Sequence, residues 1–152
     1  MSPFNILMDL RLVCWSILLV GFERCWVDRR DIFNFALEQL LVDPKNESVA
    51  VLAGGEYLSD EELIDIVSKQ VKQFDLVADI DKWRLAFLFC IESSDTSDES
   101  KTKALQEVYA NFDYPEDMAS CSIYSQSTIP PLLAMRQVIE ALKQRFLPKT
   151  GK

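Results

Sequence analysis

The sequence has 152 residues, of which 49% are hydrophobic, with 24 acidic and 16 basic side chains and no histidine. The length and apolar content suit one domain around a single core, and a net charge of −8 argues against binding the nucleic acid backbone, whose phosphates need clusters of Lys and Arg. The absence of histidine removes the commonest general base near neutral pH and the commonest transition-metal ligand. We therefore predict one non-enzymatic domain over residues 1–152, with no catalytic residue, no metal and no cofactor.

The first strongly apolar segment is residues 12–22, which precedes the charge of Glu23. It is too short to span a bilayer, which needs roughly 20 apolar residues. It also lacks the basic start and small-residue cleavage site of a signal peptide, because Asp9 balances Arg11 and Gly-Phe-Glu-Arg follows the run. We predict a buried helix over residues 13–24, no membrane contact and a cytoplasmic protein. The expected core residues of this helix are Trp15, Ile17, Leu18, Leu19 and Phe22.

Local signals predict the other helices of the first half. Residues 1–8 form a short lead-in helix, Asp28 is the N-cap of a helix over residues 29–42, and a short helix ends before Gly54 at about residue 53. Ser59 and Glu62 have the spacing of a capping box, which starts a helix over residues 60–73. Leu41 and either Val71 or Phe74 are among the apolar positions that we expect in the core.

The second half is predicted to contain three further helices. They span residues 80–92, residues 98–112 with Asp98 as cap, and residues 131–146, where Pro131 suits a first turn and Leu133 faces the core. Pro115 breaks the pattern after residue 112, residues 121–128 are expected to be irregular, and residues 149–152 to be a frayed tail. The predicted fold is all-α, a compact array of about seven or eight helices, mostly in antiparallel pairs.

Four cysteines, at positions 14, 25, 90 and 121, show no C-x-x-C spacing. They fit a reducing cytosol better than a disulfide framework. Cys25 and Cys121 are candidate nucleophiles, but without a histidine base we expect inert thiols.

Acidic side chains concentrate in the middle of the chain, where residues 56–117 contain 16 acids and 6 bases. Acids at helix starts complement the helix dipole and keep a protein soluble, and this explanation competes with a surface that attracts a basic partner. Tyr114, beside Pro115 in an acidic segment, is the expected exposed aromatic anchor. The candidate contact residues are Asp95, Asp98, Glu99, Asp113, Tyr114, Glu116 and Asp117.

The same carboxylates offer a different chemistry. They could supply oxygen ligands to a metal ion, although their spacing fits no EF-hand loop, or Asp113 and Glu116 could form a glycosidase-like acid pair. A metal-dependent hydrolase is therefore the alternative function. A structural or adaptor domain that self-associates through an apolar face is a third possibility, and the oligomeric state is left open.

Three motifs resemble the bacterial family called domain of unknown function 2247. Trp15 and Gly21 match its W-x5-G pattern, Lys82 and Trp83 match a K-W pair that opens a central helix, and residues 109–116, Tyr-Ala-Asn-Phe-Asp-Tyr-Pro-Glu, match its most specific signature except at Asn111. The resemblance covers about residues 4–118, and the following segment departs from the aromatic, methionine-and-proline ending that we expect for the family.

The resemblance implies no established catalysis. Small acidic proteins of this kind resemble the immunity proteins of bacterial polymorphic or contact-dependent toxins, which bind and block the toxin domain of their own lineage. By that analogy the partner is a basic toxin domain, a nuclease, which the acidic surface contacts. The expected function is thus a non-enzymatic, cytoplasmic toxin inhibitor.

Overall fold

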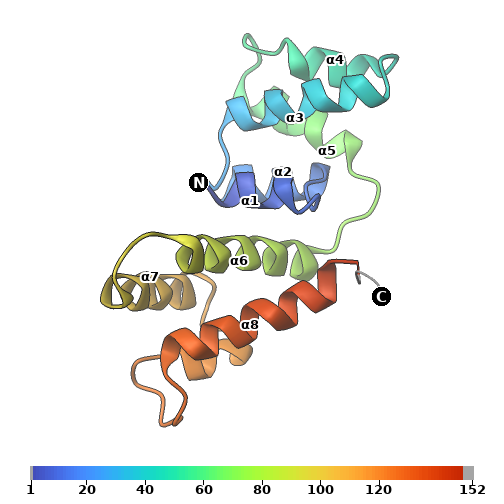
Figure 1. Cartoon of the computed structure of the whole chain (residues 1–152). Helices are drawn as coiled ribbons and strands as arrows, with labels where there is room; N and C mark the ends of the chain where they lie inside the picture. The colour runs from blue at the N-terminus through green and yellow to red at the C-terminus, as the bar shows by residue number, and fades with distance from the viewer. Residues whose placement is uncertain (1, 149–152) are drawn as a thin grey trace. The chain divides into compact units, whose positions relative to one another are not determined.

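In the computed structural model, which describes residues 2–148, the chain is all-helical (Figure 1). Within those residues there are eight α-helices, one 3-10 helix and no strand, so the predicted all-α class is confirmed. The elements are α1 (Pro3–Asp9), α2 (Trp15–Glu23), α3 (Arg29–Val42), α4 (Glu47–Ala53), α5 (Asp60–Gln70), α6 (Leu76–Ser93), α7 (Asp98–Asn111), η1 (Glu116–Cys121) and α8 (Pro131–Phe146).

The helices form two compact units. Unit 1 comprises residues 1–12 and 80–152, and unit 2 comprises residues 13–79. Unit 1 is therefore built from both ends of the sequence, while unit 2 is continuous. A single domain over residues 1–152 stays a prediction.

In unit 2, α2 supplies much of the core, as its apolar sequence predicts. Ile17 and Leu18 are fully buried, and Val20 is buried in place of the expected Leu19, which is only half-buried. Trp15 is also half-buried, with its ring edge-on to Phe35 at 4.8 Å between centroids. Within residues 2–148 no helix has both the length and the apolar character required to cross a membrane.

Polar caps fix the helix starts of unit 2. Asp28 and Asp31 form a capping box at α3, and Ser59 and Glu62 form the one predicted at α5. The Arg29 guanidinium donates to Asp60 Oδ1 at 2.7 Å and also to the carbonyls of Gly55 and Leu58. This side chain therefore fastens the start of α3 to the loop that leads into α5.

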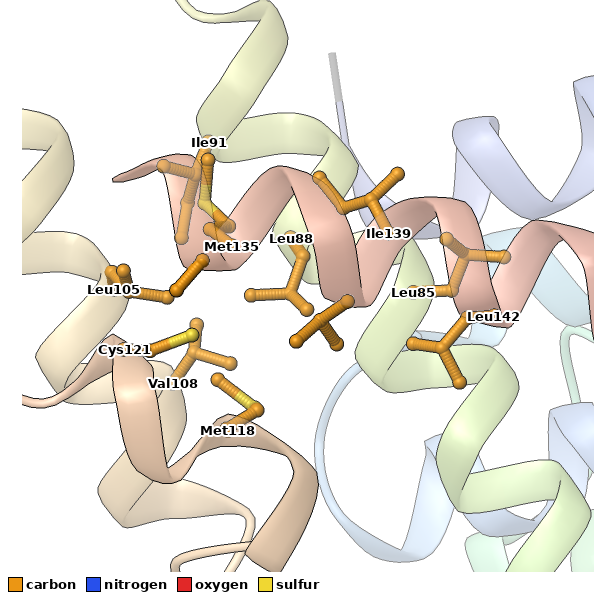
Figure 2. Packing of buried hydrophobic residues seen from close by; sticks show 12 residues of the cluster. Leu85, Leu88, Ile91, Leu105, Val108, Met118, Cys121, Met135, Ile139 and Leu142 are labelled. Atoms are coloured by element: carbon orange, nitrogen blue, oxygen red, sulfur yellow. The ribbon is translucent and has the colours of Figure 1, made fainter. Parts of the chain in front are cut away.

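The core of unit 1 forms where α6, α7, η1 and α8 meet (Figure 2). In Figure 2 the side chains of Leu85 and Leu88 from α6 face those of Ile139 and Leu142 from α8. Met118 and Cys121 fill the same core from η1, alongside Leu105 and Val108 from α7. Leu10 and Leu12, which follow α1, pack against this core from the start of the chain.

Several sequence-based boundaries need correction. Helix α6 begins at Leu76, four residues early, because Asp75 Oδ1 accepts from the Ala78 amide and starts the helix there. The N-cap of α7 is Ser97, whose hydroxyl accepts from the Ser100 amide, and Asp98 is the first helical residue. Helix α5 ends at Gln70 rather than residue 73, and η1, over Glu116–Cys121, was not predicted. Residues 122–128 lie in no helix or strand, as expected for the irregular segment. The tail at residues 149–152 lies outside the described residues.

Two residues expected in the core, Leu41 and Leu133, are exposed instead. Of the alternatives Val71 and Phe74, Val71 is half-buried and Phe74 is exposed. We also expected Val138 and Leu142 on the inward face of α8, and both are buried, together with Ala134, Met135 and Ile139. Leu133 precedes Val138 by five residues, which places it to the side of this buried face. Phe74 lies beyond the end of α5, and Leu41 lies in the last turn of α3, where its side chain is exposed.

Candidate protein interface

A strained turn follows α7. Asp113 and Tyr114 both have left-handed backbone conformations, with φ of 62° and 53°. The turn is closed by backbone hydrogen bonds from the Asp113 amide to the Ala110 carbonyl at 3.1 Å and from the Tyr114 amide to the Tyr109 carbonyl at 2.9 Å. Left-handed residues other than glycine cost roughly 1–2 kcal/mol each, and such strain tends to collect at functional sites. The expected break in the helix before Pro115 is confirmed.

In this turn the side chain of Tyr114 is exposed to solvent. Its side chain is 64% exposed, and its ring lies edge-on to Tyr109 at 5.1 Å between centroids. Tyr109 is itself partly buried against the unit 1 core. A neighbouring ring thus supports Tyr114 on one side, as befits an aromatic anchor at an interface.

A second exposed aromatic lies on the chain that leaves η1. Tyr124 is 88% exposed and follows Ile123, which is also exposed. Gln106, on α7, fixes this segment, because its Nε2 donates to the Cys121 carbonyl at 2.8 Å and its Oε1 accepts from the Ile123 amide at 3.2 Å. Gln106 precedes Tyr109 by about one turn of α7, so both exposed tyrosines are attached to neighbouring turns of one helix. We call residues 113–116 with Ile123 and Tyr124 the tyrosine surface.

Sequence reasoning missed Ile123 and Tyr124. They stand in a run of serines and polar residues with no helical or strand period, so local pattern offered no sign of a fixed conformation. The two hydrogen bonds of Gln106 provide that fixation across 15 and 17 residues of sequence. Only the presence of an aromatic residue in a polar segment was available as a signal.

The predicted acidic residues divide into two groups. Asp113, Glu116 and Asp117 lie just beyond the C-terminal end of α7, whereas Asp98 and Glu99 form its first turn and Asp95 lies in the loop before it. Helix α7 has 14 residues, so its ends lie about 20 Å apart at 1.5 Å per residue. All six side chains belong to exposed residues, but the structure does not bring them into one cluster.

Asp117 differs from the other five acids. Its Oδ1 accepts from Nη1 of Arg84 at 2.7 Å, and the Arg84 side chain is only 4% exposed. Arg84 also donates to Asp81, which accepts in turn from Arg145 at 2.6 Å. Asp117 therefore ties η1 to α6 and α8, and half of its side chain faces solvent.

Two observations concern the acidic and cysteine side chains. Among residues 2–148, no three Asp, Glu or Cys side chains lie close enough together to hold a metal ion. Burial, together with the nearby charge of Asp117, raises the pKa of the Cys121 thiol to about 11, so this cysteine is a neutral thiol at physiological pH. Cys25, the other candidate nucleophile, is exposed.

Comparison with protein families gives one match. The DUF2247 family, described as an uncharacterized protein conserved in bacteria, matches residues 4–147. The chain belongs to the DUF2247 family. No curated protein and no solved structure matches it.

The DUF2247 match also corrects one expectation. We expected the resemblance to fade after about residue 118, yet the match continues through η1, the segment of Tyr124 and the whole of α8. The packing explains this continuity, because Met118, Cys121 and one face of α8 complete the core of unit 1. The final third is therefore part of the DUF2247 fold.

Proposed function

We propose that this DUF2247 protein is a cytoplasmic immunity protein, which binds a cognate bacterial toxin domain and neutralises it without catalysis. The observation that carries the proposal is the exposure of Tyr114 on a strained turn, directly between the exposed carboxylates of Asp113 and Glu116. The toxin domain is basic, and a nuclease has that character because it must approach phosphates.

The aromatic side chains and the carboxylates contribute differently to such a complex. Tyrosines are common interface hot spots, because a rigid ring buries a large area at low entropic cost. Tyr114 and Tyr124 are the anchors in this proposal, and Ile123 adds apolar contact between them along the chain. Asp113 and Glu116 supply charge-assisted hydrogen bonds to arginines or lysines of the toxin.

The carboxylates at the other end of α7 act at longer range. Asp95, Asp98 and Glu99 are exposed and about 20 Å from the tyrosine surface along the helix. They raise the rate of encounter with a basic domain more than the strength of the final complex. Asp117 contributes chiefly to holding η1, since its oxygen is already shared with Arg84.

The decisive experiment is co-purification with the product of the gene immediately upstream, followed by calorimetry and a nuclease assay. Tyr114→Ala should weaken binding by at least about thirtyfold, in line with the 2 kcal/mol or more of a hot-spot tyrosine. Tyr57→Ala is the matched control, because Tyr57 is also an exposed tyrosine but lies in unit 2. The proposal fails if the two proteins do not associate at low salt, or if Tyr57→Ala weakens binding as much as Tyr114→Ala.

The charges can be tested without changing side-chain size. The pair Asp113→Asn and Glu116→Gln should lower the association rate and reduce its dependence on salt, and leave the melting temperature within a degree or two. The pair Asp95→Asn and Glu99→Gln should lower the association rate but hardly change the dissociation rate. Salt-independent association of the wild type would contradict an electrostatic role for either group.

A further inference from the structure

The chain between η1 and α8 is a loop whose two ends are held in the core of unit 1. Cys121, just before the loop, is fully buried, and Ile129, just after it, packs against the same core. Residues 122–128 between them lie in no helix or strand. We call residues 122–128 the serine loop, after the three serines that it contains.

The serines of this loop bond to its own backbone. The Ser122 hydroxyl accepts from the Tyr124 amide at 3.1 Å. The Ser125 hydroxyl accepts from the Ser127 amide at 3.0 Å, and the Ser127 hydroxyl accepts from the Ile129 amide at 3.1 Å. Local bonds of this kind give irregular chain a defined turn conformation. Three amides are therefore satisfied without a helix or a strand.

Gln106 ties the serine loop to α7. Its side chain donates to the Cys121 carbonyl at 2.8 Å and accepts from the Ile123 amide at 3.2 Å, so it fixes the chain at the point where the loop leaves η1. The side chains of Ile123 and Tyr124 that follow are 53% and 88% exposed. Side chains that are held in place before binding lose less conformational freedom when a partner covers them.

The serine loop differs from the neighbouring acidic turn in having no charge. Residues 118–135 contain no Asp, Glu, Lys or Arg, although charged residues make up 26% of the chain. On the exposed side of α7, Lys103 and Glu107 stand close to Gln106 in sequence and have opposite charges. A partner therefore meets this loop through apolar and hydrogen-bonding groups rather than through charge.

We propose that the serine loop is a recognition element ordered before binding, with Gln106 as the positioning residue for Ile123 and Tyr124. This role rests on the proposed toxin binding and requires a particular toxin surface, an uncharged apolar hollow beside the basic patch that meets Asp113 and Glu116. The tyrosine surface then has two parts. The contribution of the acidic turn to binding falls as salt rises, because salt screens charges, whereas that of the serine loop does not.

Amide order parameters of the free full-length protein, measured by nitrogen relaxation, test the order of the loop without any toxin. We expect about 0.85 for residues 123–127, as in rigid backbone, and lower values, toward about 0.6, in Gln106→Ala. Gln39→Ala is the matched control, because Gln39 is a half-buried glutamine of α3 in unit 2, and it should leave the loop unchanged. Values below about 0.6 in the wild type, or no change in Gln106→Ala, would overturn the proposal whether or not a toxin binds.

A double-mutant cycle with the co-purified toxin tests whether Gln106 acts through the exposed side chains. Gln106→Ala should weaken binding about threefold to tenfold, chiefly by faster dissociation, because one or two side chains must then be ordered on binding. In the background Ile123→Ala with Tyr124→Ala, the same change should weaken binding less than about twofold, because nothing is left to position. Ser122→Ala removes only the bond to the Tyr124 amide, should show the same dependence on background, and serves if Gln106→Ala does not fold. Equal losses in both backgrounds would overturn the positioning role.

Salt dependence tests the uncharged contact. Ile123→Ala with Tyr124→Ala should weaken binding by the same factor, within about twofold, at low salt and at about 0.5 M salt. The loss caused by Asp113→Asn with Glu116→Gln should shrink over the same range. If both losses shrink alike, the loop contact is not uncharged and the proposal fails. Absence of any toxin binding would refute the proposed function, whereas binding that Tyr114→Ala weakens but the loop pair does not would refute only the role of the serine loop.

Discussion

The buried guanidinium of Arg84 donates to the half-exposed carboxylate of Asp117 at 2.7 Å, although the two residues are 33 positions apart. Asp81 takes a second hydrogen bond from Arg84 and one from Arg145, so two arginines and two aspartates form a chain of ion pairs across α6, η1 and α8. Burying a charge is costly unless it is paired and hydrogen-bonded, and Arg84 meets both conditions. This network fixes η1, which connects the turn of Tyr114 to the segment of Tyr124.

Replacing Arg84 should therefore destabilise unit 1. Arg84→Met removes the charge, keeps much of the volume and leaves Asp117 without its buried partner. We expect a loss of about 2–3 kcal/mol in the free energy of unfolding, below the 3–5 kcal/mol of a fully buried pair because Asp117 is half-exposed. Urea unfolding of the wild type and the variant measures this loss. Arg136→Met, which breaks the exposed pair with Glu92, is the control and should cost less than about 0.5 kcal/mol.

Strain at the tyrosine surface predicts a trade between stability and binding. Asp113→Gly places glycine where φ is 62°, and should raise the free energy of unfolding by roughly 0.5–1 kcal/mol by relieving a left-handed residue. The same change removes a proposed toxin contact and loosens Tyr114, so binding should weaken. Thermal unfolding and calorimetry on one preparation check both effects. A glycine variant that is less stable than the wild type would show that the turn holds no strain.

Gln106 should control the order of the segment that carries Tyr124. Gln106→Glu retains an acceptor for the Ile123 amide but loses the donor to the Cys121 carbonyl, and it sets a carboxylate against that carbonyl. Loss of this partly buried hydrogen bond costs about 1–2 kcal/mol. Hydrogen exchange at residues 121–124 should accelerate by about fivefold to thirtyfold, while exchange in α3 stays unchanged. Uniform acceleration over the whole chain would instead indicate global destabilisation.

The four thiols should differ in reactivity in the native protein. Cys14 and Cys25 are exposed, Cys90 is half-buried and Cys121 is fully buried in the core of unit 1. Alkylation at pH 8 followed by mass spectrometry should label Cys14 and Cys25 first and Cys121 only when the protein unfolds. Early labelling of Cys121 would show that η1 opens readily.

The raised pKa of Cys121 makes stability depend on alkaline pH. The thiol ionises near pH 9 in the unfolded chain but near pH 11 in the folded one, so the unfolded state loses its proton first and folding weakens as pH rises from about 9 to 11. Well below pH 9 the thiol is protonated in both states, so its contribution to the free energy of unfolding does not change with pH. Between pH 8.5 and 10 the wild type should lose up to about 1 kcal/mol more than Cys121→Ala in urea unfolding. Parallel losses in the two proteins would mean that other groups cause the effect.

Local chemistry made much of the fold predictable. The N-cap Asp28, the capping box of Ser59 and Glu62, and Pro131 each mark a helix start, and the structure has a helix at each. These signals act within four residues, so they can be read without knowledge of the tertiary structure.

Most of the candidate interface could not be predicted in this way. The pattern before Pro115 indicated a break, but not that Asp113 and Tyr114 would both be left-handed. Asp117 lies 33 residues from Arg84, and the two partners of Gln106 lie 15 and 17 residues away from it. At such separations only the packing of the helices decides which groups meet. For the same reason the exposure of Leu41 could not be inferred from a helical pattern that looked like core.

Unit 1 is built from both ends of the sequence, and this arrangement sets an order for folding during synthesis. Residues 13–79 leave the ribosome as a complete unit, while Leu10 and Leu12 were made earlier but pack against side chains encoded after residue 80. At roughly 5–20 residues per second, the start of the chain waits several seconds for α8. Nascent chains stalled before Pro131 should therefore protect α3 and α5 from proteases and leave α1 open to cleavage.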